Sequence, residues 1–119
     1  MPAYQFGDVV LAEFPFADAN EMKRRPALIL SVDKDDDVIL LRITSKIRET
    51  TTDVMLRDWN KEGLRLPSIV RLEKVVTSNK IYILRSLGKL TKQDAFRVLS
   101  GLRMSCENIV SFYNTREGG

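Results

Sequence analysis

The chain has 119 residues, 44% hydrophobic and 29% charged, which is enough apolar material for a single domain over residues 1–119. Its 19 Lys and Arg residues exceed its 16 Asp and Glu residues, giving a net charge of +3. There is no histidine and one cysteine, Cys106, which excludes imidazole catalysis, His-ligated metals and an intrachain disulfide.

The sequence contains no targeting or membrane signal. The N-terminus has no apolar run of the kind a signal peptide requires, and no stretch approaches the roughly 20 apolar residues of a membrane span. We therefore expect a soluble protein of the cytoplasm that does not bind membranes.

The first part of the chain is predicted to be β-rich. Residues 9–14 form a strand that Pro15 is expected to stop, because proline lacks the ladder N–H. After a short polar loop, the apolar runs 26–32 and 38–44 flank the Asp-rich segment 33–37. Asp side chains stabilise turns by bonding to nearby backbone, so these two runs are predicted to pair as a hairpin.

The middle of the chain gives weaker signals. Short strands are predicted at 53–56, 69–72 and 80–84, with a loop at 59–63. Gly88 is expected to break the strand pattern.

A helix is predicted over about 91–113. Thr91 and Asp94 resemble a capping pattern at its start, and Gly101 inside it suggests a close contact. The apolar residues recur with helical spacing and predict one buried stripe: Ala95, Val98, Leu99, Leu102, Cys106, Ile109, Val110 and Tyr113. Cys106 is then a packing residue, and the tail from Asn114 is expected to fray.

Strands followed by one helix predict an α+β domain that is mainly β. We expect a strongly bent antiparallel sheet or small barrel over about residues 7–88, with the C-terminal helix across it.

Three cations, Lys23, Arg24 and Arg25, stand directly before Pro26 and the first buried run. Proline holds the preceding residue extended, so the Arg25 guanidinium starts from a restricted conformation. Its planar fork suits a phosphate, which it can bind through two parallel hydrogen bonds. The alternative is a solvated loop whose cations serve solubility, and the residues alone leave both open.

Thr44, Ser45 and Lys46 end the second strand of the predicted hairpin. If the turn at 33–37 closes it, Ser31 lies opposite Val38, and Arg25 comes close to Thr44. A hydroxyl beside a guanidinium can orient and stabilise a phosphoryl centre. Alternatively, Thr44 and Ser45 only end a strand.

Other residues carry weaker signals. Glu13 and Glu21 are candidate bases, and Trp59 is either a base-stacking or a packing residue. No known metal-binding or phosphate-cradling motif occurs, so we expect no metal site and no cofactor.

At these residues the sequence resembles the PemK/MazF family of toxin endoribonucleases from type II toxin–antitoxin systems. The resemblance covers nearly the whole chain. It rests on GDVVLAEFPFADANEMKRRPALILS from Gly7, on ILLRITS from Ile39, and on LPSIVRLEKVVTSNK, LRSLGKLTKQD and the closing helix.

The resemblance implies a small SH3-like β-barrel, a homodimer and an acidic antitoxin partner. It also implies cleavage of single-stranded RNA without a metal, in which the 2′-hydroxyl attacks the adjacent phosphate. The products would be a 2′,3′-cyclic phosphate and a 5′-hydroxyl. Arg25 would donate a proton and stabilise charge, and Thr44 would position the phosphate. Lys23, Arg24, Ser45, Lys46 and Glu21 would bind RNA.

The loop from Asp18 to Arg24 is shorter than the corresponding loop of many family members. This departure motivates an alternative function, a catalytically silent module on the same barrel that binds nucleic acid or, like the related gyrase poisons, a protein.

Overall fold

The computed structural model describes residues 3–16, 19–47, 50 and 52–117, which form six strands, one 3₁₀ turn and one helix. The elements are β1 (Asp8–Phe16), β2 (Ala19–Val32), β3 (Asp37–Thr44), β4 (Asp53–Leu56), β5 (Ser68–Asn79), η1 (Lys80–Tyr82), β6 (Ile83–Lys89) and α1 (Lys92–Glu117).

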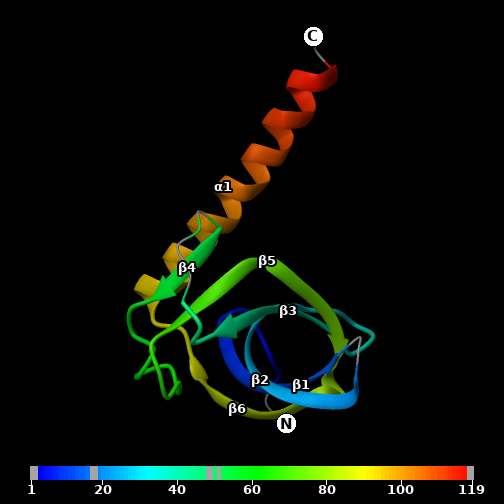
Figure 1. Ribbon diagram of the computed structural model, residues 1–119, viewed down its shortest axis with the longest axis vertical. Coiled ribbons are helices and arrows are strands. Elements are labelled where there is room, and N and C mark those ends of the chain that lie inside the picture. The colour runs from blue at the N-terminus through cyan, green and yellow to red at the C-terminus, as the bar shows by residue number, and fades with distance from the viewer. Residues whose placement is uncertain (1–2, 17–18, 48–49, 51, 118–119) are drawn as a thin grey trace.

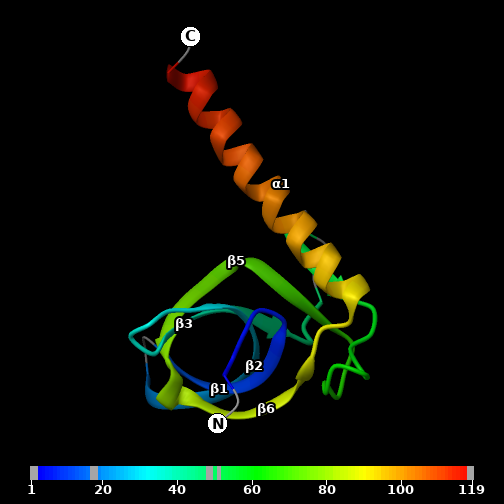
Figure 2. The same ribbon diagram turned by 180° about the vertical axis from the view of Figure 1, so that it is seen from behind.

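The strands form one antiparallel sheet in the order β4-β5-β3-β2-β1-β6. The sheet curls on itself, while α1 leaves it beside β4 and β5 and carries the C-terminus away from the barrel (Figure 1). The view from behind shows the same separation (Figure 2). The predicted α+β class, mainly β with a C-terminal helix, is confirmed.

β5 bends sharply because its pairing with β3 skips three residues. Arg71 pairs with Arg42 and Val75 with Leu41, so residues 72–74 have no opposite partner on β3. Such an insertion bends a strand and increases its twist. Leu72 turns inward at this bend, where its amide N–H donates to the Thr52 carbonyl and its side chain joins the core.

Alternation along the strands creates two apolar clusters, one on each face of the sheet. Val9, Leu28 and Leu41 belong to one cluster, which also packs against Val98 of α1. Their neighbours Val10 and Ile29 belong to the other. Because successive residues of β1, β2 and β3 belong to opposite clusters, the sequences of these strands are nearly continuous apolar runs.

The β2–β3 hairpin is confirmed. Asp33 Oδ1 accepts hydrogen bonds from the amides of Asp35 and Asp37, which closes the predicted turn. Beside the turn, Ser31 pairs with Ile39 and not with Val38, because a bulge shifts the register between Ile29 and Ser31. Beyond the bulge the pairing is the predicted one.

The prediction of a polar loop before Arg25 is wrong. Strands β1 and β2 continue past Pro15 and pair with each other as a two-stranded hairpin. Pro15 pairs with Met22 inside β1. The pairing of β1 with β6 ends at Ala12, so this part of β1 is an edge. A proline is tolerated at an edge because its missing N–H faces no partner strand.

Gly88 does not end a strand either, since it lies inside β6. The strand predicted at 80–84 is a 3₁₀ turn followed by the start of β6. A Cβ added to Gly88 would lie 2.5 Å from the Glu62 carbonyl oxygen, and one added to Gly63 would lie 2.0 Å from the Leu87 carbonyl oxygen. These two glycines let the loop between β4 and β5 pack directly on the β6 backbone.

We predict that Gly63→Ala costs more stability than Gly7→Ala. Both glycines have positive φ, 89° and 95°, but a Cβ at Gly7 meets nothing within 4 Å. We expect a loss of about 1 kcal/mol for Gly7→Ala from the conformation alone, and about 3 kcal/mol or more for Gly63→Ala. Urea denaturation of both variants checks this, and equal losses would contradict the backbone contact.

Helix α1 is longer than predicted, and its stripe is only partly buried. Val98 is fully buried, but Cys106 and Ile109 are exposed, so the prediction of a buried Cys106 is wrong. The helix runs beyond the sheet, which leaves nothing in the described chain to cover its last turns (Figure 1). The stripe residues exposed for this reason are Cys106, Ile109, Val110 and Tyr113. Leu99 is exposed as well, although it follows the buried Val98.

The tail predicted to fray from Asn114 is helical to Glu117. The close contact predicted at Gly101 is confirmed, since an added Cβ would lie 2.7 Å from Leu72 Cδ1.

Buried acids anchor the first turn of α1. Asp94, which is 0% exposed, accepts hydrogen bonds from the amides of Arg57 and Asp58 at 3.2 and 2.9 Å. Thr91 donates from its amide to Glu62 Oε2 and from its hydroxyl to Asp58 Oδ2. The weak bond from the Asp94 amide to Thr91 Oγ1, at 3.4 Å, matches the predicted cap.

Glu62 and Asp94 titrate in opposite directions. Burial raises the pKa of Glu62 to about 7, helped by the negative charges of Asp94 and Asp58 and opposed by the Thr91 N–H. Burial also acts to raise the pKa of Asp94, but the N–H donors, Glu62 and Arg97 outweigh it, so that pKa is lowered. These pKa directions place a proton on Glu62 and leave Asp94 ionised.

We predict that the free energy of unfolding falls as pH rises from 5 to 8. The folded state raises the pKa of Glu62 above its ordinary 4.5, so the folded protein holds this proton more tightly than the unfolded chain. The stabilisation is complete below pH 4.5 and is lost as pH rises through about 7, a change on the order of 1–3 kcal/mol.

Denaturation of the wild type and of Glu62→Gln across this range provides the test. The amide is neutral at every pH and is buried without a charge, so the variant should show a flatter profile and higher stability than the wild type at pH 8. Parallel profiles for the two proteins would show that Glu62 does not carry the effect.

Candidate functional site

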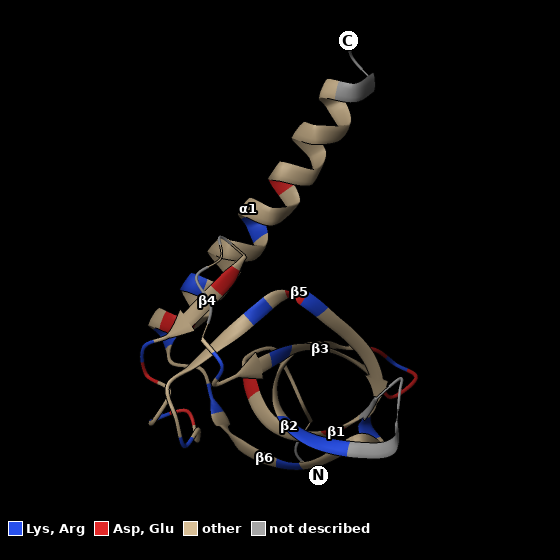
Figure 3. Cartoon of the chain, viewed as in Figure 1, with Lys and Arg blue, Asp and Glu red and all other residues tan. Residues whose placement is uncertain are grey.

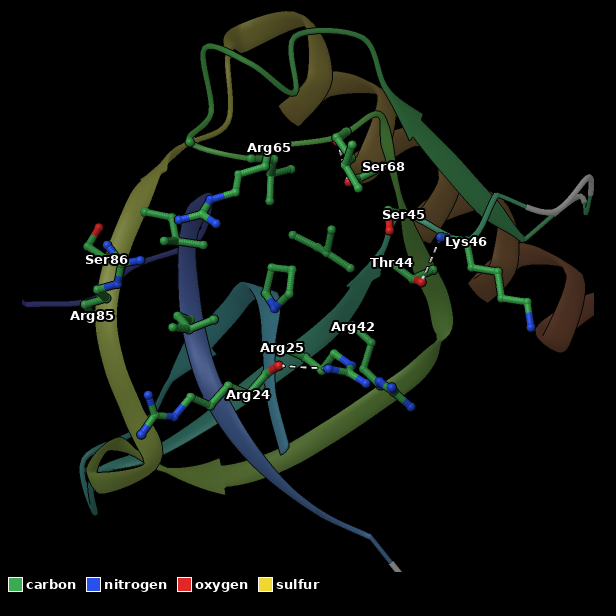
Figure 4. A pocket seen from close by; sticks show the side chains of 17 residues that line it. Arg24, Arg25, Arg42, Thr44, Ser45, Lys46, Arg65, Ser68, Arg85 and Ser86 are labelled. Atoms are coloured by element: carbon green, nitrogen blue, oxygen red, sulfur yellow. Dashed lines mark hydrogen bonds between the residues drawn. The ribbon is translucent and has the colours of Figure 1, made fainter. Parts of the chain in front are cut away.

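A cavity of about 860 Å³ opens where β1, β2, β3 and β6 meet the loop before β5. Figure 4 shows the side chains that line it. Six are basic: Arg24, Arg25, Arg42, Lys46, Arg65 and Arg85. No lining residue in the described chain is acidic, so the cavity is strongly electropositive.

Arg25 and Thr44 line this cavity from neighbouring strands. Pairing of Ala27 with Arg42 and of Leu28 with Leu41, continued by two residues, places Arg25 opposite Thr44. Opposite residues of an antiparallel pair share a face, so Arg25, Arg42 and Thr44 project from the same side of the sheet. The side-chain view shows Arg25 and Arg42 on the same part of the wall (Figure 4).

Two contacts restrict these cations. Arg25 Nη1 donates to the Arg24 carbonyl at 3.1 Å, which holds the side chain against its own strand and leaves its other N–H groups to a ligand. The Arg42 guanidinium lies over the buried Phe14 ring, 5.9 Å from its centroid. Both guanidinium groups are therefore partly ordered before any ligand binds.

The Thr44 hydroxyl is oriented by the backbone. Thr44 Oγ1 accepts a hydrogen bond from the Lys46 amide at 3.1 Å (Figure 4). Because that bond occupies a lone pair, the hydroxyl hydrogen can be donated to a bound oxygen atom. The same bond folds the chain after β3, which keeps Ser45 and Lys46 at the cavity.

Of the other residues predicted to bind RNA, some line the cavity and others lie outside it. Arg24 lines the cavity, is 68% exposed and lies 3.6 Å from Glu13 in an ion pair. That pair gives Glu13 a structural partner, and Glu13 does not line the cavity. Lys23 pairs with Phe14 farther along the hairpin and is not a lining residue. Glu21 belongs to β2, but its side chain lies outside the described residues, so its role stays a prediction.

Part of the cavity lining was not predicted from the sequence. Arg42 could have been found, because it stands two residues before Thr44 in a strand and so shares its face. Arg65, Ser68, Arg85 and Ser86 carried no such signal. They reach the cavity only because the loop before β5 packs on β6. Trp59 is partly buried against the core, which favours packing over base stacking.

Among the described residues, no group of three or more His, Cys, Asp or Glu side chains is arranged to hold a metal ion. No helix in the described part of the chain is long and apolar enough to cross a membrane.

Solved structures share this fold. An endoribonuclease from a mycobacterial species, solved with its cognate antitoxin, is 20% identical and covers 88% of this chain and 96% of its own, with a TM-score of 0.68. A second mycobacterial endoribonuclease is 21% identical over 90% and 94%, with a TM-score of 0.70. The Mycobacterium tuberculosis toxin MazF-mt6 is 21% identical over 84% and 96%, with a TM-score of 0.68.

No curated protein matches the sequence closely enough to be compared. The family comparison is decisive, because residues 5–106 match the PemK-like, MazF-like toxins of type II toxin–antitoxin systems. This match spans β1 through β6 and more than half of α1, including every residue that lines the cavity. The chain therefore belongs to the PemK-like, MazF-like toxin family, as the resemblance of its motifs predicted.

Proposed function

We propose that this toxin is an endoribonuclease that cleaves single-stranded RNA without a metal. The observation that carries the proposal is the convergence of Arg25, inside β2, and Thr44, at the end of β3, in a cavity with six basic and, among the described residues, no acidic lining residues. Membership of the toxin family, and the endoribonucleases that share its fold, support the same reaction.

The cavity suits single-stranded RNA in both charge and shape. Its cations match a phosphodiester backbone, and the apolar side chains of Leu11, Pro26, Ile43 and Leu64 lie between them. An unpaired base can bury its face on such a surface, whereas a base within a duplex is stacked and inaccessible. The site therefore favours unpaired RNA over a duplex.

In the proposed reaction the RNA supplies its own nucleophile. The 2′-hydroxyl gives its proton to a water molecule as its oxygen attacks the adjacent phosphorus, and the bond from phosphorus to the 5′-oxygen of the next nucleotide breaks. The 5′-oxygen takes up a proton from water, so the products are a 2′,3′-cyclic phosphate and a 5′-hydroxyl. Arg25 donates hydrogen bonds to the phosphate oxygens, where negative charge develops, and to the departing oxygen.

Thr44 positions the phosphate. Its oxygen accepts a hydrogen bond from the Lys46 amide, which leaves its hydrogen to donate to a phosphate oxygen beside Arg25. Arg24, Ser45 and Lys46 would hold the backbone on either side, and Lys23 and Glu21 would contact RNA along the extended hairpin.

We expect two protein partners, an antitoxin and a second copy of this chain. An antitoxin with an acidic segment would compete with RNA for the cations of the cavity, and one of the structures with this fold contains its cognate antitoxin.

The exposed apolar residues on the distal half of α1, among them Ile109 and Val110, favour the predicted homodimer. We place the reaction in the cytoplasm, where its RNA substrate lies.

We predict that Arg25→Ala lowers the cleavage rate by about 10²–10⁴-fold, because charge on the phosphate is then unopposed at the reacting centre. Arg25→Lys should recover only part of that loss, since an ammonium group lacks the bidentate fork. Arg103→Ala, an exposed residue of α1 outside the cavity, is the matched control. Single-turnover cleavage of a long RNA measures the rates, and undiminished cleavage by Arg25→Ala would exclude the assignment.

We predict that Thr44→Val reduces cleavage by about 10-fold or more while Thr44→Ser retains most of it, because only the hydroxyl is required. Thermal denaturation should show similar stability for both variants, which separates a lost hydroxyl from a damaged fold. Equal activity of the valine and serine variants would show that the hydroxyl does not act.

We predict that cleavage persists in EDTA and stops when 2′-deoxy nucleotides replace the ribonucleotides at the cut site. End-group analysis of the products should find cyclic phosphate and 5′-hydroxyl. Loss of activity in EDTA would contradict the metal-independent reaction. RNA binding without turnover would instead support a silent binding module.

A further inference from the structure

The cavity has a second basic wall that the proposed reaction does not use. Arg65 comes from the loop before β5, and Arg85 with Ser86 comes from β6. In the side-chain view these three residues lie on the opposite side of the cavity from Arg25, Arg42 and Thr44 (Figure 4). In the charge-coloured cartoon, basic segments mark β2, β3 and β6 around this opening (Figure 3).

The two walls are too far apart in the sheet to serve one phosphate. Leu11 of β1 pairs with Arg85 on one side and with Pro26 on the other. At the usual strand spacing of about 4.8 Å, the Arg85 backbone lies about 10 Å from β2 and farther from Thr44 on β3. By the same pairing, Arg85 shares a face of the sheet with Leu11 and Pro26, whereas Arg25, Arg42 and Thr44 project from the other face. The two walls therefore meet different points of a strand that passes through the cavity.

Neither cation of the second wall is neutralised within the protein. In the described ranges Arg65 and Arg85 form no ion pair, whereas Arg24 is paired with Glu13. Two guanidinium groups in a cavity without acidic lining among the described residues attract an anion, and a phosphate matches the fork of each.

The loop that carries Arg65 is held in place. Leu64 is buried in the core, and its amide donates to the Trp59 carbonyl at 3.1 Å. Gly63 and Gly88 bring the loop against the β6 backbone, and Ser68 Oγ donates to the Leu66 carbonyl at 2.8 Å. A ligand therefore meets an ordered wall and does not have to fix the loop.

Between the two walls the floor is apolar, formed by Leu11, Pro26 and Leu64. A further phosphate would be poorly solvated there, but a nucleobase or ribose would cover apolar surface. The sequence of surfaces across the cavity, basic then apolar then basic, matches the alternation of phosphate, nucleoside and phosphate in an RNA strand.

We propose that Arg65 and Arg85 form a second phosphate-binding position, one nucleoside away from the phosphate that Arg25 and Thr44 act on. This inference rests on the proposed ribonuclease function and adds a length requirement. The substrate must extend past the scissile bond far enough to place a phosphate between Arg65 and Arg85. Both residues position RNA and take no part in the chemical step.

The test uses the double variant R65A/R85A and RNA oligonucleotides built around a cut site mapped with the wild type. On the full-length oligonucleotide we expect KM to rise about 10–100-fold with kcat changed less than about 3-fold. The plot of log kcat/KM against log salt should lose slope by about 0.7 for one phosphate contact. R65K/R85K should recover part of the loss, because lysine retains the charge.

Shortened substrates give the decisive comparison. Oligonucleotides that lack the phosphate on one side of the scissile bond, or carry an uncharged methylphosphonate there, should be poor for the wild type. The double variant should lose nothing further on them. A loss in the variant that is equally large on full and shortened substrates, or a fall in kcat alone, would overturn the proposal.

The control double variant R57A/R103A removes two exposed arginines outside the cavity and should leave KM unchanged. Binding of a non-cleavable 2′-deoxy oligonucleotide, followed by fluorescence anisotropy, separates the two hypotheses. If the wild type cleaves no RNA, the ribonuclease function fails, yet R65A/R85A must still bind this oligonucleotide about 10-fold more weakly. Unchanged affinity of the double variant would overturn the second position whether or not the protein cleaves.

Discussion

The antiparallel register of β2 and β3 is the constraint on which both the core and the site depend. With Leu28 opposite Leu41, each strand divides its side chains between two apolar clusters. The same register, carried to the end of β3, sets Arg25 of β2 beside Thr44. A slip by one residue would turn the apolar set outward and send the cation and the hydroxyl to opposite faces. The turn at Asp33 therefore helps to place Arg25 beside Thr44, although it lies at the far end of the hairpin.

The second constraint is the contact between the loop before β5 and the β6 backbone. Without side chains at Gly63 and Gly88, two backbone segments approach more closely than any other residue allows. This contact builds the wall that carries Arg65, Arg85 and Ser86, and so turns one end of a barrel into a cavity. At these two positions the close approach of two backbone segments requires glycine more strictly than a turn would.

Some features of the fold and of the cavity could be predicted from the sequence, and others could not. The hairpin and the meeting of Arg25 with Thr44 were predictable, because a turn and a two-residue period determine them. The extension of β1 past Pro15 was not, because it depends on where β6 stops pairing. Periodicity found the stripe of α1 but not its burial, since the sheet ends before the helix does. Arg65 and Arg85 belong to elements that meet only through tertiary packing, so no local pattern could join them.

The charges on one loop show how the fold keeps its cavity basic. Asp58, Glu62 and Arg65 lie within eight residues, yet the two acids bond to the first turn of α1 while Arg65 lines the cavity. Burial raises the pKa of Glu62 and so reduces its negative charge, and Arg97 compensates Asp94 at 3.3 Å. Had Glu62 faced the cavity, its carboxylate would have paired with an arginine that RNA needs. Anchoring the helix with buried acids thus both fixes α1 and leaves the cations of the cavity to the phosphates.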